Sequence, residues 1–110
     1  MTSDPKAPID LEHLATYTLG DRALELELLT MFVPSAKGYI EAMGEGPGAG
    51  FWTAAHSLKG VALGVGATEL ADLAALAEPL KDAGREIRDE HIAKLGAALE
   101  RVRRFVADTG

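Results

Sequence analysis

A single histidine stands in a pattern that favours phosphate chemistry. Within the stretch AAHSLKGVALGVGATEL, residues 54–70, His56 is followed by Lys59 one helical turn later and by Gly60 four positions later. A neutral imidazole nitrogen is a nucleophile, and a nearby ammonium group can offset the charge of a phosphoryl group bound to it. A glycine inside a helix costs about 1 kcal/mol relative to alanine, so Gly60 indicates close approach by another surface. Together these residues predict reversible phosphoryl acceptance on an exposed histidine.

The same helix is predicted to carry a stripe of residues away from its core. Trp52, His56, Lys59 and Leu63 are spaced by one helical turn each, which places them on one face. We therefore expect His56 to point outward, with Trp52 and Leu63 beside it as candidate docking residues for a partner. For Trp52, covering the core is an equally open role.

Other residues of these types lack such companions. His13 and His91 have neither a Lys-Gly neighbour nor a second ligand at metal-site spacing, so we expect solvated helix residues and no metal site. Glu78 is expected to be a surface or capping residue and not a catalytic acid. Gly66, with Gly64 before it, is expected to end the helix and to allow a tight turn between two neighbouring helices.

Helices must position these residues. Alanine, leucine and glutamate dominate the chain, aromatic residues make up only 5%, and strict alternation of apolar and polar residues is scarce. Asp10 is expected to cap a short helix that ends at Gly20. The apolar residues of that short helix are Leu11, Leu14 and Tyr17.

The next helix is predicted to be capped by Asp21 and to contain Pro34. The missing amide and fixed φ of this proline should bend or split the helix near residues 32–34. Steps of three and four predict the core face as Leu24, Leu28, Met31, Phe32, Ser35, Tyr39 and Met43. Residues 45–50, EGPGAG, are expected to form a flexible connection.

Three further apolar seams predict three further helices. The first seam consists of Phe51, Ala55, Leu58, Ala62 and Val65. The second consists of Leu70, Leu73, Ala77 and Leu80, with Pro79 as a late kink and an end near Gly84. The third consists of Ile92, Leu95, Leu99, Val102 and Val106, in a helix capped by Asp89 with an outer Glu100–Arg104 pair.

These elements predict an all-α protein. One short and four longer helices joined by short turns favour an antiparallel up-and-down four-helix bundle with a short N-terminal capping helix. Residues 1–8, with two prolines and polar content, are expected to form a disordered N-terminal tail. The helical bundle domain is expected over residues 9–108.

Composition excludes several classes of function. A chain of 110 residues fits one small domain, and the absence of cysteine removes disulfides, thiolate nucleophiles and cysteine-based metal sites. The net charge of -6 argues against binding of nucleic acid or of an anionic membrane. No apolar run is long enough to span a membrane. We expect a cytoplasmic protein.

The motif residues resemble the histidine-containing phosphotransfer (HPt) domain family of two-component phosphorelays. The family's Ala-His-x-Leu-Lys-Gly core is matched from Ala55 to Gly60. Its later positions are matched by Gly66, Ala67, Leu70 and Glu78, and its earlier helix by Gly20, Asp21, Leu28, Leu29 and Phe32. The resemblance covers about residues 9 to 107. Two departures, Ala77 where leucine is common and the glycine-rich loop at 45–50, concern local packing and partner fit.

The resemblance implies a role for each partner. His56 would be phosphorylated on Nε2 by the aspartyl phosphate of a response-regulator receiver domain and would pass the group to another receiver. The partners would be response-regulator receiver domains and a hybrid sensor histidine kinase. The family has no kinase activity of its own, and Mg²⁺ belongs to the receiver. The chain is therefore expected to be a monomeric relay intermediate with no cofactor and no autonomous enzymatic activity.

Two other functions are compatible with the same residues. A helical adaptor could bind a receiver or kinase through Trp52, His56 and Leu63 without phosphorylation. A small histidine-dependent hydrolase or phosphatase ranks lower, because a lone exposed histidine has no orienting group, oxyanion site or water exclusion in the sequence pattern.

Overall fold

A computed structural model describes residues 7–109 of the chain. These residues form α1 (Leu11–Thr18), α2 (Arg22–Met43), α3 (Ala49–Val65), α4 (Thr68–Ala77), the 3-10 helix η1 (Glu78–Leu80) and α5 (Arg85–Thr109). No strand occurs within this part of the chain, so the all-helical prediction is confirmed. Of the predicted N-terminal tail, residues 1–6 lie outside the described residues.

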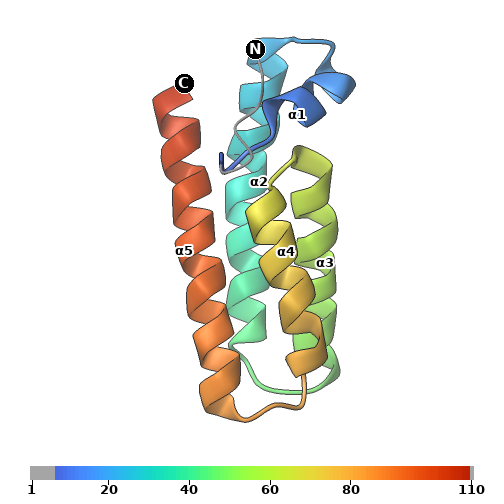
Figure 1. Ribbon diagram of the computed structural model, residues 1–110, viewed down its shortest axis with the longest axis vertical. Coiled ribbons are helices and arrows are strands. Elements are labelled where there is room, and N and C mark those ends of the chain that lie inside the picture. Colours follow the sequence, from blue (N-terminus) through green and yellow to red (C-terminus); the bar gives the residue numbers. More distant parts are fainter. Residues whose placement is uncertain (1–6, 110) are drawn as a thin grey trace.

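The four longest α-helical segments lie side by side (Figure 1). The chain reverses direction from α2 to α3, from α3 to α4, and again from α4 to α5 (Figure 1). Both α2 and α4 pack against α3 and against α5, and α1 packs against α2 and α3. The turn between α3 and α4 therefore lies at the same end of the molecule as α1 (Figure 1).

Two aspartates cap the first two helices as predicted. The Asp10 carboxylate accepts a hydrogen bond from the amide of His13, and the Asp21 carboxylate accepts one from the amide of Leu24, each at 3.1 Å. Such caps satisfy amides that have no partner inside the helix. Gly20, with a φ of 81°, adopts the left-handed conformation just after α1, which turns the chain into α2.

The segment before α1 is fastened to the turn between α3 and α4. The amide of Asp10 donates to the carbonyl of Gly66 at 2.8 Å. Gly66 ends α3 with a φ of 80°, and a Cβ at this position would lie 2.8 Å from the Asp10 carbonyl oxygen. The fold thus requires glycine at position 66 for two reasons: its backbone is left-handed, and the backbone at Asp10 approaches it closely.

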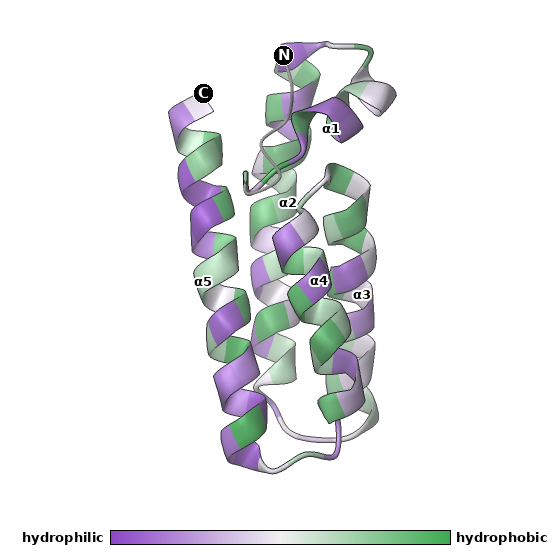
Figure 2. Ribbon diagram, viewed as in Figure 1, coloured by the Kyte–Doolittle hydropathy of each residue, from purple (hydrophilic) through white to green (hydrophobic). Residues whose placement is uncertain are grey.

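The core seams of the last three long helices largely match the prediction. On α3, the seam residues Phe51, Ala55, Leu58 and Ala62 are fully buried. Most residues of the other two seams are also buried: Leu70, Ala77, Leu95, Leu99 and Val102. In Figure 2, α5 is mostly hydrophilic, with hydrophobic residues recurring at intervals along it, as expected of a helix that covers one side of a core.

The predicted core face of α2 is wrong by one residue along part of the helix. Leu24, Met31 and Ser35 are exposed, and Tyr17 on α1 is exposed as well. Phe32 and Met43 are buried as predicted, whereas the other buried residues, Glu25, Leu29 and Ala36, each follow a predicted residue by one position. Burial of Glu25 is possible because the hydroxyl of Thr18 donates to its carboxylate at 2.6 Å.

Several predicted boundaries also differ. Pro34 does not split α2, which is continuous from Arg22–Met43. Pro34 is exposed, and packing of α2 against α1, α3 and α5 outweighs the loss of one backbone hydrogen bond. Gly64 lies inside α3 and does not end it. Asp89 does not cap α5, which begins at Arg85, one turn earlier. Pro79 lies in η1, where the α-helical geometry of α4 gives way.

Candidate functional site

The turn between α3 and α4 brings His56 and Glu78 together. The two residues are each eleven positions from Ala67, at the centre of the turn. Because α3 and α4 run in opposite directions (Figure 1), residues equally far from the turn lie at the same height along the two helices. Glu78 is the first residue of η1, and it reaches α3 from that position.

Glu78 binds two side chains of α3 at once. One carboxylate oxygen lies 2.7 Å from Nδ1 of His56, and Nζ of Lys59 donates to the carboxylate at 3.2 Å. The side chain of Glu78 is 16% exposed, that of Lys59 29% and that of His56 53%. The carboxylate is therefore the shielded base of a cluster whose imidazole faces solvent.

The charge of Glu78 decides the tautomer of the histidine. Burial alone would raise the pKa of Glu78, but hydrogen bonds from His56 and then Lys59 outweigh it, and the net pKa is below the usual value of 4.5. Glu78 is thus a carboxylate near neutral pH, and a carboxylate only accepts hydrogen bonds. Nδ1 of His56 must therefore carry the proton, which leaves the lone pair of the neutral ring on Nε2.

Trp52 lies against one face of the imidazole. The ring centroids of Trp52 and His56 are 4.6 Å apart and the ring planes differ by 10°, which is a stacked arrangement. Trp52 itself is 40% exposed. The spacing of one helical turn on α3 makes the contact possible.

On the other side of His56, one turn towards the end of α3, Gly60 leaves open space. Apart from the adjoining backbone of α3, no heavy atom of residues 7–109 lies within 4 Å of the position that a Cβ on Gly60 would occupy. Because the fold itself has room for a side chain here, the glycine removes bulk only from the solvent side. The arrangement supplies an oriented nucleophilic nitrogen, a cation beside it and an unobstructed approach.

Comparison with known families agrees with this chemistry. A family model of the Hpt domain matches residues 27–105, a range that includes every residue of the cluster. The chain belongs to the Hpt domain family. Hpt domains are phosphotransfer modules of histidine phosphorelay signalling and interact with receiver and kinase partners. The comparisons with curated proteins and with solved structures found no match.

In this Hpt domain the residues singled out from the sequence do not all form one cluster. His56, Lys59 and Trp52 are in mutual contact directly or through Glu78, and Gly60 lies one turn from His56. Leu63 is exposed further along α3. Gly66 takes no part in the cluster and instead forms the turn that sets the register of α3 against η1.

The sequence pattern predicts Glu78 on the surface or at a cap and does not predict its role in the site. Glu78 is the residue that joins His56 and Lys59. The signal was available: an antiparallel helix pair that turns at Ala67 places position 78 opposite position 56. That inference requires the turn and the direction of both helices, which the spacing of apolar residues predicts.

The other histidines have different surroundings. Nε2 of His13 is buried, with no hydrogen-bond partner among residues 7–109, and its ring packs edge-on against Tyr17. His13 is therefore half-buried and not the solvated residue that was expected. Nδ1 of His91 lies 3.1 Å from the carbonyl of Ile87 in its own helix.

Residues 7–109 contain no group of three or more histidine, aspartate or glutamate side chains that could hold a metal ion. None of the helices in that range has the length and apolar character needed to cross a membrane.

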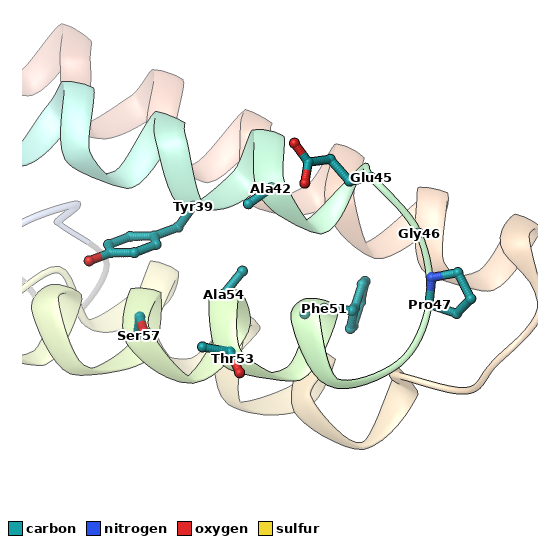
Figure 3. Close-up of a pocket in the computed structure, with 10 residues that line it drawn as sticks. Tyr39, Ala42, Glu45, Gly46, Pro47, Phe51, Thr53, Ala54 and Ser57 are labelled. Carbon is teal, nitrogen blue, oxygen red and sulfur yellow. The ribbon is translucent and has the colours of Figure 1, made fainter.

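A groove lies between α2 and α3, on the side of α3 away from Glu78. Tyr39, Ala54 and Ser57 are among its lining residues. Figure 3 shows Ala54 pointing towards α2, whereas the carboxylate of Glu45 points away from the groove. The described lining includes the hydroxyl residues Tyr39, Thr53 and Ser57 but not His56, Lys59 or Glu78, so the charged cluster on α3 lies outside this groove.

Proposed function

We propose that this Hpt domain accepts a phosphoryl group on Nε2 of His56 from the aspartyl phosphate of a receiver domain and passes it to another receiver. The observation that carries the proposal is the 2.7 Å contact between Nδ1 of His56 and Glu78. That contact directs the lone pair to Nε2 on a ring that is 53% exposed, and an exposed, oriented nucleophile is what transfer between two proteins requires.

In the transfer step the Nε2 lone pair attacks phosphorus. The N–P bond forms as the bond from phosphorus to the aspartyl oxygen breaks, and the aspartate leaves as a carboxylate. The imidazole keeps its proton on Nδ1 and becomes a phosphorylated cation. The Glu78 carboxylate accepts a hydrogen bond from that Nδ1 proton and carries the opposite charge, so it stabilises the product ring. The same step in reverse transfers the phosphoryl group to the aspartate of a second receiver.

We propose that the ammonium group of Lys59 moves towards the phosphoryl group once His56 is phosphorylated. In the unphosphorylated domain its ammonium pairs with Glu78 at 3.2 Å. The lysine stem is flexible and its charge acts as a mobile point. A phosphoryl group on the neighbouring imidazole brings new anionic oxygens, towards which Lys59 can turn while Glu78 keeps the imidazole.

The remaining chemistry is assigned to the partner. We propose that the receiver supplies Mg²⁺ and the phosphoaspartate, that this chain uses no cofactor of its own, and that it is a relay intermediate without autonomous enzymatic activity. We also propose that it acts as a monomer in the cytoplasm, within an antiparallel four-helix bundle capped by α1.

The test is transfer of label from a receiver phosphorylated with a labelled donor in Mg²⁺. Wild type should acquire label that is labile in acid and stable in alkali, and His56→Gln should acquire none while keeping its helical circular dichroism. His91→Gln, which changes a histidine on α5, is the matched control and should be labelled like wild type. Label on His56→Gln would contradict the assignment.

The adaptor function is the alternative, and the exposure of Trp52 and Leu63, 40% and 51%, is the observation in its favour. It predicts that folded wild type binds a receiver yet gains no label from any of a panel of phosphorylated receivers. It also predicts binding that His56→Gln leaves unchanged.

A further inference from the structure

We infer that Trp52 is a positioning residue for phosphotransfer, which holds the plane of the His56 imidazole, and not the docking residue that its exposure suggests. The inference rests on the proposed phosphotransfer function and adds to it a residue that acts through His56. Its starting observation is the parallel stack of the two rings, with centroids 4.6 Å apart and planes at 10°.

Two contacts in different directions are needed to fix an imidazole ring. The hydrogen bond from Nδ1 to Glu78, at 2.7 Å, holds one edge of the ring but permits rotation about the line that joins the two atoms. The indole of Trp52 covers a face of the same ring and removes that rotation. Together Glu78 and Trp52 define where the Nε2 lone pair points, and exact placement of a nucleophile has large effects on rate.

The helix itself explains why the stack forms on this side. Side chains of an α-helix lean towards its N-terminus, so His56 leans towards the turn that carries Trp52 and away from the turn that carries Gly60. Trp52 has the largest side chain in the protein, whereas Gly60 has no side chain. Apart from the adjoining backbone of α3, none of the described atoms lies within 4 Å of a Cβ placed on Gly60, so a receiver has its open path from the Gly60 side.

The stack also suits the phosphorylated state. The product ring is a cation, and an electron-rich indole face attracts a cation at stacking distance. Trp52 and Glu78 would therefore both favour the phosphorylated ring, one through its face and one through its edge. Loss of the indole face should slow transfer about tenfold, since both the orientation and this attraction are lost.

Two substitutions separate stacking from docking. Trp52→Phe keeps an aromatic face, whereas Trp52→Leu keeps apolar bulk without one. We expect Trp52→Phe to retain most of the maximal transfer rate and Trp52→Leu to lower it about tenfold, with the receiver concentration at half-maximal rate unchanged. Leu63→Ala is the comparison on the same helix and should raise that concentration without changing the maximal rate.

A second measurement needs no phosphorylation. The ring protons of His56 should resonate upfield in the NMR spectrum of wild type, because they lie over the indole, and Trp52→Leu should move them downfield. Circular dichroism and thermal unfolding check that each variant is folded. Trp52 is the only tryptophan in the chain, so its fluorescence reports the same contact and should change in His56→Gln.

The outcomes distinguish this inference from the function on which it rests. Wild type that takes no label from any receiver contradicts the proposed function and with it the inference. Wild type that is labelled normally contradicts the inference alone if Trp52→Leu transfers at the same maximal rate, or if it only raises the half-maximal receiver concentration. Unshifted His56 ring protons in Trp52→Leu would contradict it too.

Discussion

Glu78 and Glu25 are both shielded carboxylates that accept a short hydrogen bond from another helical segment, yet they serve different regions. Glu25 on α2 binds the hydroxyl of Thr18 at 2.6 Å, and both residues are nearly enclosed, at 6% and 5% exposed. Glu78 binds His56 at 2.7 Å, and that imidazole is 53% exposed. The first pair closes the corner between α1 and α2.

The difference lies in what remains free on the donor. A buried hydroxyl that has donated its proton has no further chemistry to offer a partner protein. An imidazole that donates from Nδ1 still presents Nε2. The same carboxylate contact is therefore structural at the end of the molecule where α1 packs, and it orients a nucleophile on the open face of α3. Substitutions in the two regions should separate stability from transfer.

The largest effect is expected at the structural end, from Gly66→Ala. The alanine would have to adopt a left-handed φ, and its methyl group would lie 2.8 Å from the Asp10 carbonyl oxygen. We expect a loss of about 3 kcal/mol in the free energy of unfolding, measured by urea denaturation. Gly96→Ala, inside α5 with open space around it, is the control and should be neutral or stabilising. Equal stability of the two variants would contradict the conclusion that the left-handed backbone and the close approach of Asp10 require glycine at position 66.

The next effect is on transfer, from Glu78→Ala. Without the carboxylate the imidazole loses its edge contact, and Lys59 loses its partner, so the rate of phosphoryl transfer to His56 should fall roughly tenfold to a hundredfold. Glu78→Gln keeps the shape and an acceptor oxygen but no charge, and should fall between. Both should unfold close to the wild-type temperature, because the site is partly exposed.

The control for Glu78 is Glu100→Gln on α5, which removes a carboxylate paired with Arg103 away from the site. It should transfer like wild type. If Glu78→Ala instead lowers stability strongly and leaves the rate unchanged, then Glu78 is a structural residue like Glu25, and the contrast between the two regions fails.

A smaller effect is expected from Thr18→Val. Valine matches threonine in shape but cannot donate, so the carboxylate of Glu25 stays buried without the hydroxyl. The free energy of unfolding should fall by about 1–2 kcal/mol, and the transfer rate at a temperature where the domain is folded should not change. Thr30→Val removes an exposed hydroxyl that bonds only its own helix and should cost less than about 0.5 kcal/mol.

The sequence predicts these two regions unequally. The α3 seam is correct because Phe51, Ala55, Leu58 and Ala62 leave one apolar register. The α2 register fails because leucine, methionine and phenylalanine occur on several sides of that helix, and because nothing in the sequence marks Glu25 as buried. Its burial depends on Thr18, which belongs to another helix.

The site divides in the same way. His56, Lys59 and Gly60 were identified because their spacing on one helix is meaningful by itself. Glu78 required pairing two helices about the turn at Ala67. The stack of Trp52 on His56 depends on side-chain rotamers, and the spacing of one turn is compatible with docking, core cover or stacking.

The smallest expected effect is the dependence of stability on Glu78 and pH. Hydrogen bonds from His56 and Lys59 outweigh burial and lower the pKa of Glu78 below its usual 4.5 in the folded state. A group with a lowered folded pKa stabilises the fold above its unfolded pKa, and this stabilisation is lost as the pH falls through the folded pKa. The contribution should be below about 1 kcal/mol, because the cluster is partly exposed and screened.

The measurement compares urea unfolding of wild type and Glu78→Gln from pH 7 to pH 3. Glu100 titrates at acid pH as well, since hydrogen bonding to Arg103 lowers its pKa to about 2, but it is present in both proteins and cancels in their difference. The stability difference between the two should be constant above about pH 5 and should shrink below it. A stability difference that stays the same down to pH 3 would mean that the His56 and Lys59 contacts do not stabilise the charged form of Glu78. It would contradict the conclusion that these contacts lower the pKa of Glu78.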